Sequence, residues 1–359
     1  MGRGLVRVRP EVVGEVEFRS WTSDRIIRHA SFQGLRRDKP AEDVVQETPG
    51  RKTGKAESAK AGAGKAVPQA SAGGASTSVK LSHPDKLLWP DEKVSKQDLL
   101  DHYALVWPRM EPFVVNRPLS LVRAPDGVHG PRFFQKHASP GMSDKIARMK
   151  DPGDGEEILF IRDFDGLAAL VQYGVVEVHI WGSTIDALEA PDQIIFDLDP
   201  DEGVDAEAVR AAALDIHAKL DELSLPNLVK TSGGKGYHVL VPLKPAADWE
   251  AVKGFAHDFA RALEQGAPKH YTATLSKKAR TGKIFVDYLR NGRGSTTVAP
   301  YSSRAKKGAT VSMPVTWPEI EAGMPPNAFP LGDASTLAQL KKADPWKDFF
   351  KLGKPLKRG

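Results

Sequence analysis

Apolar residues recur every three or four positions in three stretches of the chain, which is the spacing of one buried helix face. These stretches follow Ser95, Asp205 and Asp248, residue types whose side chains accept hydrogen bonds from a helix N-terminus. We therefore predict three helices, the last of which ends at Gly266. The residues expected to face the core are Leu99, Leu100, Tyr103, Val106, Trp107, Ala208, Val209, Ala212, Ile216, Leu220, Val252, Phe255, Phe259 and Leu263.

Short apolar runs that favour β-strands lie between and after these helices. They span residues 175–180, 193–198, 237–241, 284–289 and 296–299. Because the helices and strands do not alternate regularly, we expect an α+β fold with a mixed β-sheet core and flanking helices.

Residues 49–78 interrupt this pattern, because they contain no aromatic residue and consist mainly of Gly, Ala, Ser and Lys. Such a segment cannot bury enough apolar surface to offset its ordering entropy, so we expect a flexible basic linker. The linker divides residues 1–48, whose alternating apolar positions predict β structure, from a long domain over residues 79–359. About fifty residues are few for an independent fold, so the first segment is expected to be a fragment of a larger domain.

The composition is that of a soluble globular protein, with 40% hydrophobic and 27% charged residues among 359. No apolar run approaches the length of a membrane span, and we recognise no secretory signal, so we expect a cytoplasmic protein. The absence of cysteine excludes disulfides and thiolate metal sites. The net charge of +5 suits a polyanionic partner, although a modest basic excess is weak evidence for nucleic-acid binding.

Two carboxylates, Asp197 and Asp199, stand two positions apart at the end of the strand predicted over residues 193–198. Alternate strand residues point to the same face, so these side chains converge and repel unless a cation or proton lies between them. One interpretation is a site for Mg²⁺ or Mn²⁺, ions that bind carboxylate oxygens. The other is a solvated acidic turn, which the sequence DPDEG also favours.

A glycine-rich turn, KTSGGKGYHVLV (230–241), leads into a strand that carries His238. Its glycines allow close backbone approach, and Ser232 and Lys235 can donate hydrogen bonds to phosphate. The spacing is not that of a Walker A loop, and a simple glycine hairpin is the alternative.

Two further polar side chains stand inside apolar strands. Asp287 would be costly to bury unless it is liganded by a metal or paired with Arg290 or Arg293. His179 lies in VEVHIWG, and a lone strand histidine is more often structural than catalytic.

Basic and aromatic residues gather upstream of these strands. Lys86 and Lys96 lie near the first predicted helix start, where the helix dipole favours anions. The segment RFFQKH (132–137) sets Phe133 and Phe134 between basic residues, a combination that suits base stacking with phosphate neutralisation. Because adjacent strand residues face opposite ways, we expect at least one of these phenylalanines to pack in the core.

Taken together, residues 79–317 resemble the polymerase domain of bacterial ligase D, an end-joining repair enzyme of the archaeo-eukaryotic primase superfamily. The resemblance lies in FDLDP, TSGGKGYHV and IFVDYLRNGRG in this order, and in VEVHIWGS and TTVAPYSSRAKKGATVSMPVTW. Residues 1–48, with VRPEVVGEVEF and RHASFQGLRRDKP, resemble the C-terminal end of the OB domain of ATP-dependent DNA ligases. The Lys-x-Asp-Gly motif of those ligases does not occur in this sequence, so the resemblance predicts no ligase activity.

The resemblance implies a primase-like polymerase that adds ribo- or deoxyribonucleotides to 3′ ends at gaps and double-strand breaks. Two divalent cations, Mn²⁺ or Mg²⁺, would be held by Asp197, Asp199 and Asp287. The nucleoside triphosphate (NTP or dNTP) would be held by His179, Ser232, Lys235, His238, Arg290 and Arg304.

The resemblance also implies DNA contacts and partners. Lys86 and Lys96 would bind the 5′-phosphate at a break, with His83 in a position where the family often has asparagine. Phe133 or Phe134 would stack on a base or on template DNA, and Arg280 would align the 3′ end. The expected partners are 5′-phosphorylated DNA, the Ku end-binding protein and a ligase module in cis or in trans, at the bacterial nucleoid.

Two other functions stay open from the residues alone. A metal-dependent glycosyltransferase uses an Asp-x-Asp pair to hold a nucleotide sugar, although it needs neither the Ser232–His238 motif nor a third strand acid. A non-catalytic DNA-end-binding module would keep these acids for structural reasons.

Overall fold

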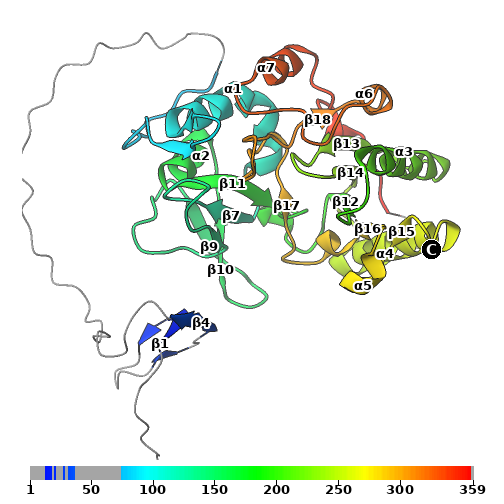
Figure 1. The fold of residues 1–359 in the computed structure, drawn as a ribbon, viewed down its shortest axis with the longest axis horizontal. Helices are drawn as coiled ribbons and strands as arrows, with labels where there is room; N and C mark the ends of the chain where they lie inside the picture. Colours follow the sequence, from blue (N-terminus) through cyan, green and yellow to red (C-terminus); the bar gives the residue numbers. More distant parts are fainter. Residues whose placement is uncertain (1–12, 18–19, 22–26, 29–30, 37–73, 357–359) are drawn as a thin grey trace, which may run out of the picture. The chain divides into compact units, whose positions relative to one another are not determined.

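The computed structural model describes residues 13–17, 20–21, 27–28, 31–36 and 74–356 of the chain, which divides into units at residues 1–68 and 69–359. In the first unit, β1 (Val13–Glu17) pairs antiparallel with β4 (Ser31–Arg36), and β2 (Ser20–Trp21) pairs with β3 (Ile27–Arg28) (Figure 1). The β structure predicted for residues 1–48 is thus confirmed where the chain is described.

The second unit is built on two antiparallel-rich sheets. In the first sheet the strand order is β17 (Thr297–Val298), β11 (Val175–Ile180), β7 (Leu119–Arg123), β10 (Glu157–Phe160) and β9 (Ala147–Lys150), and β8 (Phe133–Gln135) also pairs with β7. In the second sheet the order is β15 (Tyr271–Thr272), β16 (Ile284–Asp287), β12 (Gln193–Pro200), β14 (Tyr237–Pro242), β13 (Leu228–Thr231) and β18 (Pro314–Val315). A hairpin of β5 (Leu87–Trp89) and β6 (Val94–Ser95) precedes them.

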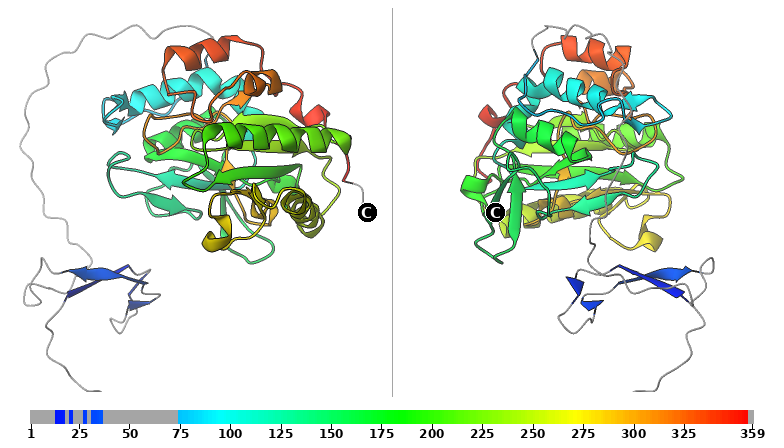
Figure 2. Two further views of the ribbon diagram at one scale, coloured as in Figure 1. Left: turned by 45° about the vertical axis from the view of Figure 1, so that its right-hand side comes forward. Right: turned by 90° about the vertical axis from the view of Figure 1, so that its left-hand side faces the viewer.

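Helices flank both sheets (Figure 2). They are α1 (Lys96–Val114), α2 (Phe164–Gln172), α3 (Ala206–Glu222), α4 (Trp249–Gly266), α5 (Lys277–Arg280), α6 (Trp317–Glu321) and α7 (Ala334–Lys341). The three predicted helices are confirmed as α1, α3 and α4, and Ser95, Asp205 and Asp248 cap them through side-chain hydrogen bonds. The α+β architecture expected from the sequence is therefore correct.

One face of the second sheet is covered by α3 and α4. The ring of Phe196 on β12 lies 4.7 Å from that of Phe259 on α4, and Tyr271 on β15 donates to Asp215 on α3 at 3.0 Å. Since alternate residues of a strand point to opposite faces, Asp197 and its neighbours of the same parity project from the other face of this sheet.

Several predicted boundaries move, most of them by one or two residues, and two of the shifts have a clear cause. The strand predicted over residues 284–289 ends at Asp287, because the chain turns there into a 3₁₀ helix, η3 (Leu289–Asn291). The predicted linker lies outside the described residues up to residue 73, but residues 74–78 are bound to the second unit. Thr77 Oγ1 donates to Asp165 at 2.6 Å and the Ser78 amide donates to the same carboxylate at 2.8 Å, so Ser and Thr in this stretch serve as anchors rather than as spacer.

No helix in the described part of the chain is both long and apolar enough to cross a bilayer.

Candidate active site

The register of the strands places Asp287, the third predicted metal ligand, next to Asp197, the first. Asp197 on β12 is directly paired with Asp287 on β16 on one side and with His238 on β14 on the other. Directly paired cross-strand residues project from the same face, and Asp199 shares that face because it is two positions further along β12. The three acids and His238 are therefore grouped on the sheet face that α3 and α4 leave open.

Arg290, at the start of the turn after β16, lies between two of the acids. Its Nε is 3.0 Å from Oδ2 of Asp287 and 3.5 Å from Oδ2 of Asp197. Of the two salt-bridge partners considered for Asp287, Arg290 is the one that the structure shows, whereas Arg293 pairs with Asp151 and Glu189. Arg290, which was predicted to bind the triphosphate, thus neutralises two carboxylates in this structure.

Asp199 has a cation of its own. Arg280 on α5 donates from NH1 to Oδ2 of Asp199 at 3.1 Å, and its guanidinium carbon lies 3.6 Å from the centre of the Phe285 ring. Arg280, which was predicted to align the 3′ end of the primer, therefore contacts Asp199, a predicted metal ligand.

The environments of the acids differ. Burial raises the pKa of Asp197, but the neighbouring His238 and Arg290 more than offset this and hold the pKa below its usual range. Burial, helped by the charge of Asp197, raises the pKa of Asp199. Burial also raises the pKa of Asp287, against the opposing effect of Arg290. Asp197 is thus the most firmly ionised of the three.

These residues border a cavity of about 230 Å³ between the two sheets. Of the predicted metal and triphosphate ligands, all but Asp287 line it: Asp197, Asp199, His179, Ser232, Lys235, His238, Arg290 and Arg304. The cavity joins β11 and β17 of the first sheet with β12 and β14 of the second, so the grouping that the motifs suggest is realised in space.

The glycine-rich loop forms one wall of this cavity. Ser232 Oγ accepts hydrogen bonds from the amides of Gly234 at 3.1 Å and Gly236 at 3.2 Å. A hydroxyl has one donor hydrogen in addition to its lone pairs, so the Ser232 hydrogen is left to donate to a ligand. Gly233 has a φ of +65°, a conformation that glycine adopts without strain.

One buried nitrogen atom in the cavity wall, Nδ1 of His238, has no hydrogen-bond partner within the described residues, whereas Nε of Arg304 faces the Glu177 carboxylate at 3.3 Å. Buried polar atoms are nearly always satisfied, so Nδ1 of His238 fits a pocket that receives a polar ligand. Burial and the charge of Lys230 lower the pKa of His238 to about 4, although Asp197 opposes them. His238 is therefore neutral at physiological pH.

The three acids do not yet form a complete binding site for divalent cations, because arginines contact their oxygens. Within the described residues, no group of three or more histidine, aspartate and glutamate side chains is set up to hold an ion. Carboxylates that face one another remain the ligands that Mg²⁺ and Mn²⁺ prefer. Because Arg290 and Arg280 contact their oxygens, binding of two cations would require these arginines to move away.

The upstream basic residues come together at the start of α1. The Lys86 amide donates to the carbonyl of His83 at 3.0 Å, and the Lys96 amide donates to that of Lys86 at 2.8 Å. The Lys86 ammonium is half-exposed and pairs with Asp126 at 3.2 Å. The Lys96 ammonium is buried and donates to Ser82 O and to both oxygens of Gln172, so its three hydrogens are already used.

Both phenylalanines of β8 are exposed, by 50% for Phe133 and 57% for Phe134. The expectation that one of them packs in the core is wrong, because β8 pairs only with β7 and neither of its faces is covered. The Phe134 ring meets His179 edge-on with 6.2 Å between ring centres, so Phe134 is the one beside the cavity.

Comparison with known proteins identifies the family. A family model described as "LigD, primase-polymerase domain" matches residues 95–346. The chain belongs to the LigD primase-polymerase domain family. A second model, "ATP dependent DNA ligase C terminal region", matches residues 2–39, in agreement with the resemblance seen in the first segment.

Relatives of this LigD family member are named as multifunctional non-homologous end joining proteins. The chain is 40% identical to the multifunctional non-homologous end joining protein LigD of Pseudomonas aeruginosa over 347 residues, which is 95% of this chain and 40% of that protein. It is 34% identical to the LigD of Mycolicibacterium smegmatis over 67% of this chain and 32% of that protein. The chain thus spans well under half the length of these relatives.

A solved structure shares the fold. The polymerase domain of Mycobacterium tuberculosis ligase D in complex with DNA matches with a TM-score of 0.69 and 29% identity, covering 76% of this chain and 98% of that one. The α+β primase-polymerase fold is therefore shown for this LigD family member.

Two side chains at the site escaped sequence analysis. Lys306 lines the cavity two residues after Arg304, and the lysine-rich run SSRAKKG is the signal that could have pointed to it. Glu177 is buried behind His179, and a charged residue within the apolar run VVEVHI is the corresponding signal.

Proposed function

We propose that this chain is a DNA-repair nucleotidyltransferase that adds ribo- or deoxyribonucleotides to the 3′ ends of primers at gaps and double-strand breaks. The observation that carries this proposal is the pairing of Asp197 with Asp287 at a cavity whose wall also holds Ser232 and Arg304. Membership in the LigD primase-polymerase family supports it.

Each cavity residue has a role in this proposal. The Ser232 hydroxyl and the Arg304 guanidinium donate hydrogen bonds to phosphate oxygens, and Lys235 and Lys306 supply positive charge. The neutral ring of His238 directs Nε2 to Asp197, so its unpartnered Nδ1 is a hydrogen-bond acceptor that suits a hydroxyl of the ligand. Together the serine, the arginine and the lysines orient the triphosphate so that its α-phosphate faces the acids.

Asp197, Asp199 and Asp287 are the residues that would hold two divalent cations, Mn²⁺ or Mg²⁺. Bound cations of this kind lower the pKa of an attacking hydroxyl and stabilise charge on a phosphoryl group. In their absence Arg290 and Arg280 neutralise the acids, and both side chains can turn toward phosphate when cations replace them.

DNA contacts complete the proposal. Lys86, beside the N-terminus of α1, binds the 5′-phosphate at a break, with His83 and the start of the helix nearby. Lys96 supports this surface by fixing the backbone around it, and it reaches a phosphate only by giving up one of its present acceptors. Phe134 stacks on a base next to His179, and Phe133 is available to template DNA.

We further propose that the enzyme acts in non-homologous end joining at the bacterial nucleoid, with a ligase module in cis or in trans and with Ku. The names of its relatives support this setting. Residues 1–48 would be the end of a ligase OB domain and residues 49–73 a linker, and without a Lys-x-Asp-Gly motif these residues do not ligate DNA.

The decisive experiment is extension of a gapped, 5′-phosphorylated duplex with each ribo- and deoxyribonucleotide, with Mn²⁺, with Mg²⁺ and with neither. We expect metal-dependent extension by the parent chain and none by Asp199→Ala, while both bind the duplex equally, because the variant loses a metal ligand and no DNA contact.

Extension by Asp199→Ala at the parental rate would refute the metal assignment. Binding without metal-dependent incorporation by the parent would instead identify a DNA-end-binding module, and turnover of a nucleotide sugar would identify a glycosyltransferase.

A further inference from the structure

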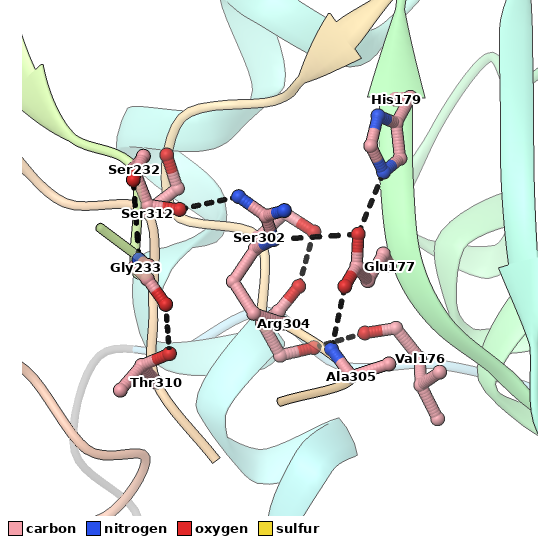
Figure 3. Close-up of polar contacts among 12 residues, drawn as sticks. Val176, Glu177, His179, Ser232, Gly233, Ser302, Arg304, Ala305, Thr310 and Ser312 are labelled. Atoms are coloured by element: carbon pink, nitrogen blue, oxygen red, sulfur yellow. Dashed lines mark hydrogen bonds and ion pairs between the residues drawn. The ribbon is translucent and has the colours of Figure 1, made fainter. Parts of the chain in front are cut away.

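A buried carboxylate joins two of the side chains that line the cavity (Figure 3). Glu177 lies on β11 and is only 5% exposed. Its Oε2 is 2.7 Å from Nε2 of His179 and 3.3 Å from Nε of Arg304, and its Oε1 accepts a 2.6 Å hydrogen bond from the amide of Ala305. The donors around Glu177 thus belong to the cavity wall or directly adjoin it.

This carboxylate fixes the protonation of its neighbour. Burial raises the pKa of Glu177, but the hydrogen bond from His179 and the charge of Arg304 outweigh burial and lower the pKa to about 2. Glu177 is therefore an anion at neutral pH, and a carboxylate anion only accepts hydrogen bonds. It follows that Nε2 of His179 carries the proton and that Nδ1 is the nitrogen free for another partner.

The network reaches the second sheet through Arg304. NH1 of Arg304 donates to the carbonyl oxygen of Ser232, and the hydroxyl of Thr310 donates to the next carbonyl, that of Gly233 (Figure 3). One arginine therefore connects Glu177 on the first sheet with the glycine-rich loop on the second. This connection is one of several that hold the loop, since the amide of Gly233 also donates to the carbonyl of Pro326 at 3.0 Å.

A purely structural role would not require a carboxylate here. The amide of Val178 donates to Ser302 Oγ at 3.0 Å, and Ser303 Oγ donates to the carbonyl of Val176 at 2.7 Å. These neutral hydrogen bonds already hold residues 302–305 against β11. Burying a charged carboxylate costs more free energy than burying neutral hydrogen-bonding groups. What the Glu177 carboxylate adds to the neutral hydrogen bonds is its contact with the side chains of His179 and Arg304.

We propose that Glu177 is a positioning residue of the nucleotide pocket, which leaves Nδ1 of His179 as a hydrogen-bond acceptor for a hydroxyl of the bound nucleotide and aims Arg304 at its phosphates. The identity of the ligand rests on the function proposed above, whereas the contact with His179 can be tested without it. Removal of a group that orients a metal ligand typically lowers metal affinity or activity by about 10- to 100-fold, and we expect an effect of the same order for a group that orients a phosphate ligand.

The first test is ¹⁵N NMR of the imidazoles in the nucleotide-free protein, with His179 assigned through His179→Gln. We expect Nε2 of His179 to be protonated in the parent. Ala305 and His179 meet different oxygens of Glu177, and Glu177→Gln replaces one of these oxygens with an NH₂ donor. With the oxygen kept at Ala305 and the NH₂ donating to Nε2, we expect the His179 proton to shift toward Nδ1. A parent protein with the proton on Nδ1 overturns the proposal, whatever the chain does with nucleotides.

The second test compares primer extension by Glu177→Gln and by Asp192→Asn. Asp192 is a matched control, because it is also buried and paired with an arginine, Arg117, at 2.9 Å but does not line the cavity. We expect Glu177→Gln to raise KM for the nucleotide by about tenfold or more, with a smaller change in kcat. Asp192→Asn should lower Tm and leave KM unchanged.

An unchanged KM in Glu177→Gln, or an equal rise in Asp192→Asn, overturns the proposal. If the parent adds no nucleotide at all, the proposed function fails, and the NMR result alone then decides whether Glu177 sets the state of His179.

Discussion

His102 on α1 is buried within the second unit, and its Nε2 lies 2.9 Å from the carbonyl oxygen of Tyr301. A carbonyl only accepts, so Nε2 carries a proton and donates it. Burial lowers the pKa of His102 from 6.5 to about 4, although the hydrogen bond to Tyr301 opposes it. This residue therefore makes the stability of the fold depend on pH.

The dependence has a definite sign. Between pH 6.5 and pH 4 the unfolded chain binds a proton at His102 that the folded chain does not. The contribution of neutral His102 to the free energy of unfolding is therefore complete above pH 6.5 and is lost as the pH falls toward 4. The loss amounts to roughly 3 kcal/mol. We expect His102→Gln, which can still donate to Tyr301, to show a smaller fall in unfolding free energy over this range. Urea denaturation at several pH values measures it, and a parental slope in the variant would contradict the assignment.

At the scale of elements, β12 and the loop before β14 meet without room for a side chain. A Cβ atom added to Gly236 would lie 1.9 Å from the carbonyl oxygen of Leu198, the residue between Asp197 and Asp199. Only glycine allows this approach, and the acids of β12 keep their place because the loop can lie so close.

We therefore expect Gly236→Ala to push β12 away and to destabilise the protein by about 3 kcal/mol, at the upper end of what overpacking costs. Nucleotide addition should fall with it. Gly254→Ala is the matched control, because Gly254 lies inside α4 with nothing within 4 Å of its Cβ position, so alanine there should be neutral or stabilising by up to ~1 kcal/mol. Equal denaturation midpoints for the two variants would show that the contact does not matter.

Elements with a regular pattern were predictable from the sequence. The helices α1, α3 and α4 have a polar face and a side-chain cap, and β12 alternates apolar residues with acids at its end. Residues 164–172 gave no such signal, because α2 is buried along nearly its whole length and has no polar face. The strands of the first sheet around β7 are three to five residues long, too short for a period to emerge.

The predicted ligands of the site came from short motifs, and most of them do line one cavity. The pair of Asp287 with Arg290 was one of two that the sequence suggested, but most other partners of those ligands were not predictable, because they are set by tertiary geometry. The pairing of Arg290 with two acids, the support of His179 by Glu177 and the saturated ammonium of Lys96 all depend on residues distant in sequence or on local geometry that no motif specifies.

At the scale of the whole polymerase unit, the proposed DNA surface near α1 and the proposed nucleotide cavity are separate groups of residues that can be altered independently. Within this proposed DNA surface, burial lowers the pKa of Lys96, and Lys86 is close enough for its charge to lower that pKa further. They differ in how their charges are used, since the Lys86 ammonium is half-exposed beside Asp126 and that of Lys96 is bound by protein oxygens. A substitution of Lys96 would therefore disturb the fold as well as any phosphate contact.

Lys86→Ala is accordingly the clean test of the 5′-phosphate site. A half-exposed ion pair is worth about 1 kcal/mol, so we expect the ratio of affinities for 5′-phosphorylated and 5′-hydroxyl gaps to fall roughly fivefold. Lys244→Ala removes an equal charge from an exposed position after β14. It should weaken the binding of both DNAs equally and leave the ratio of the two affinities unchanged. Fluorescence anisotropy at fixed salt gives both affinities, and the salt must be fixed because every lost phosphate contact also lowers the salt dependence. If Lys86→Ala behaves like Lys244→Ala, the terminal phosphate is recognised elsewhere on the molecule, while the nucleotide cavity and its acids are untouched by that result.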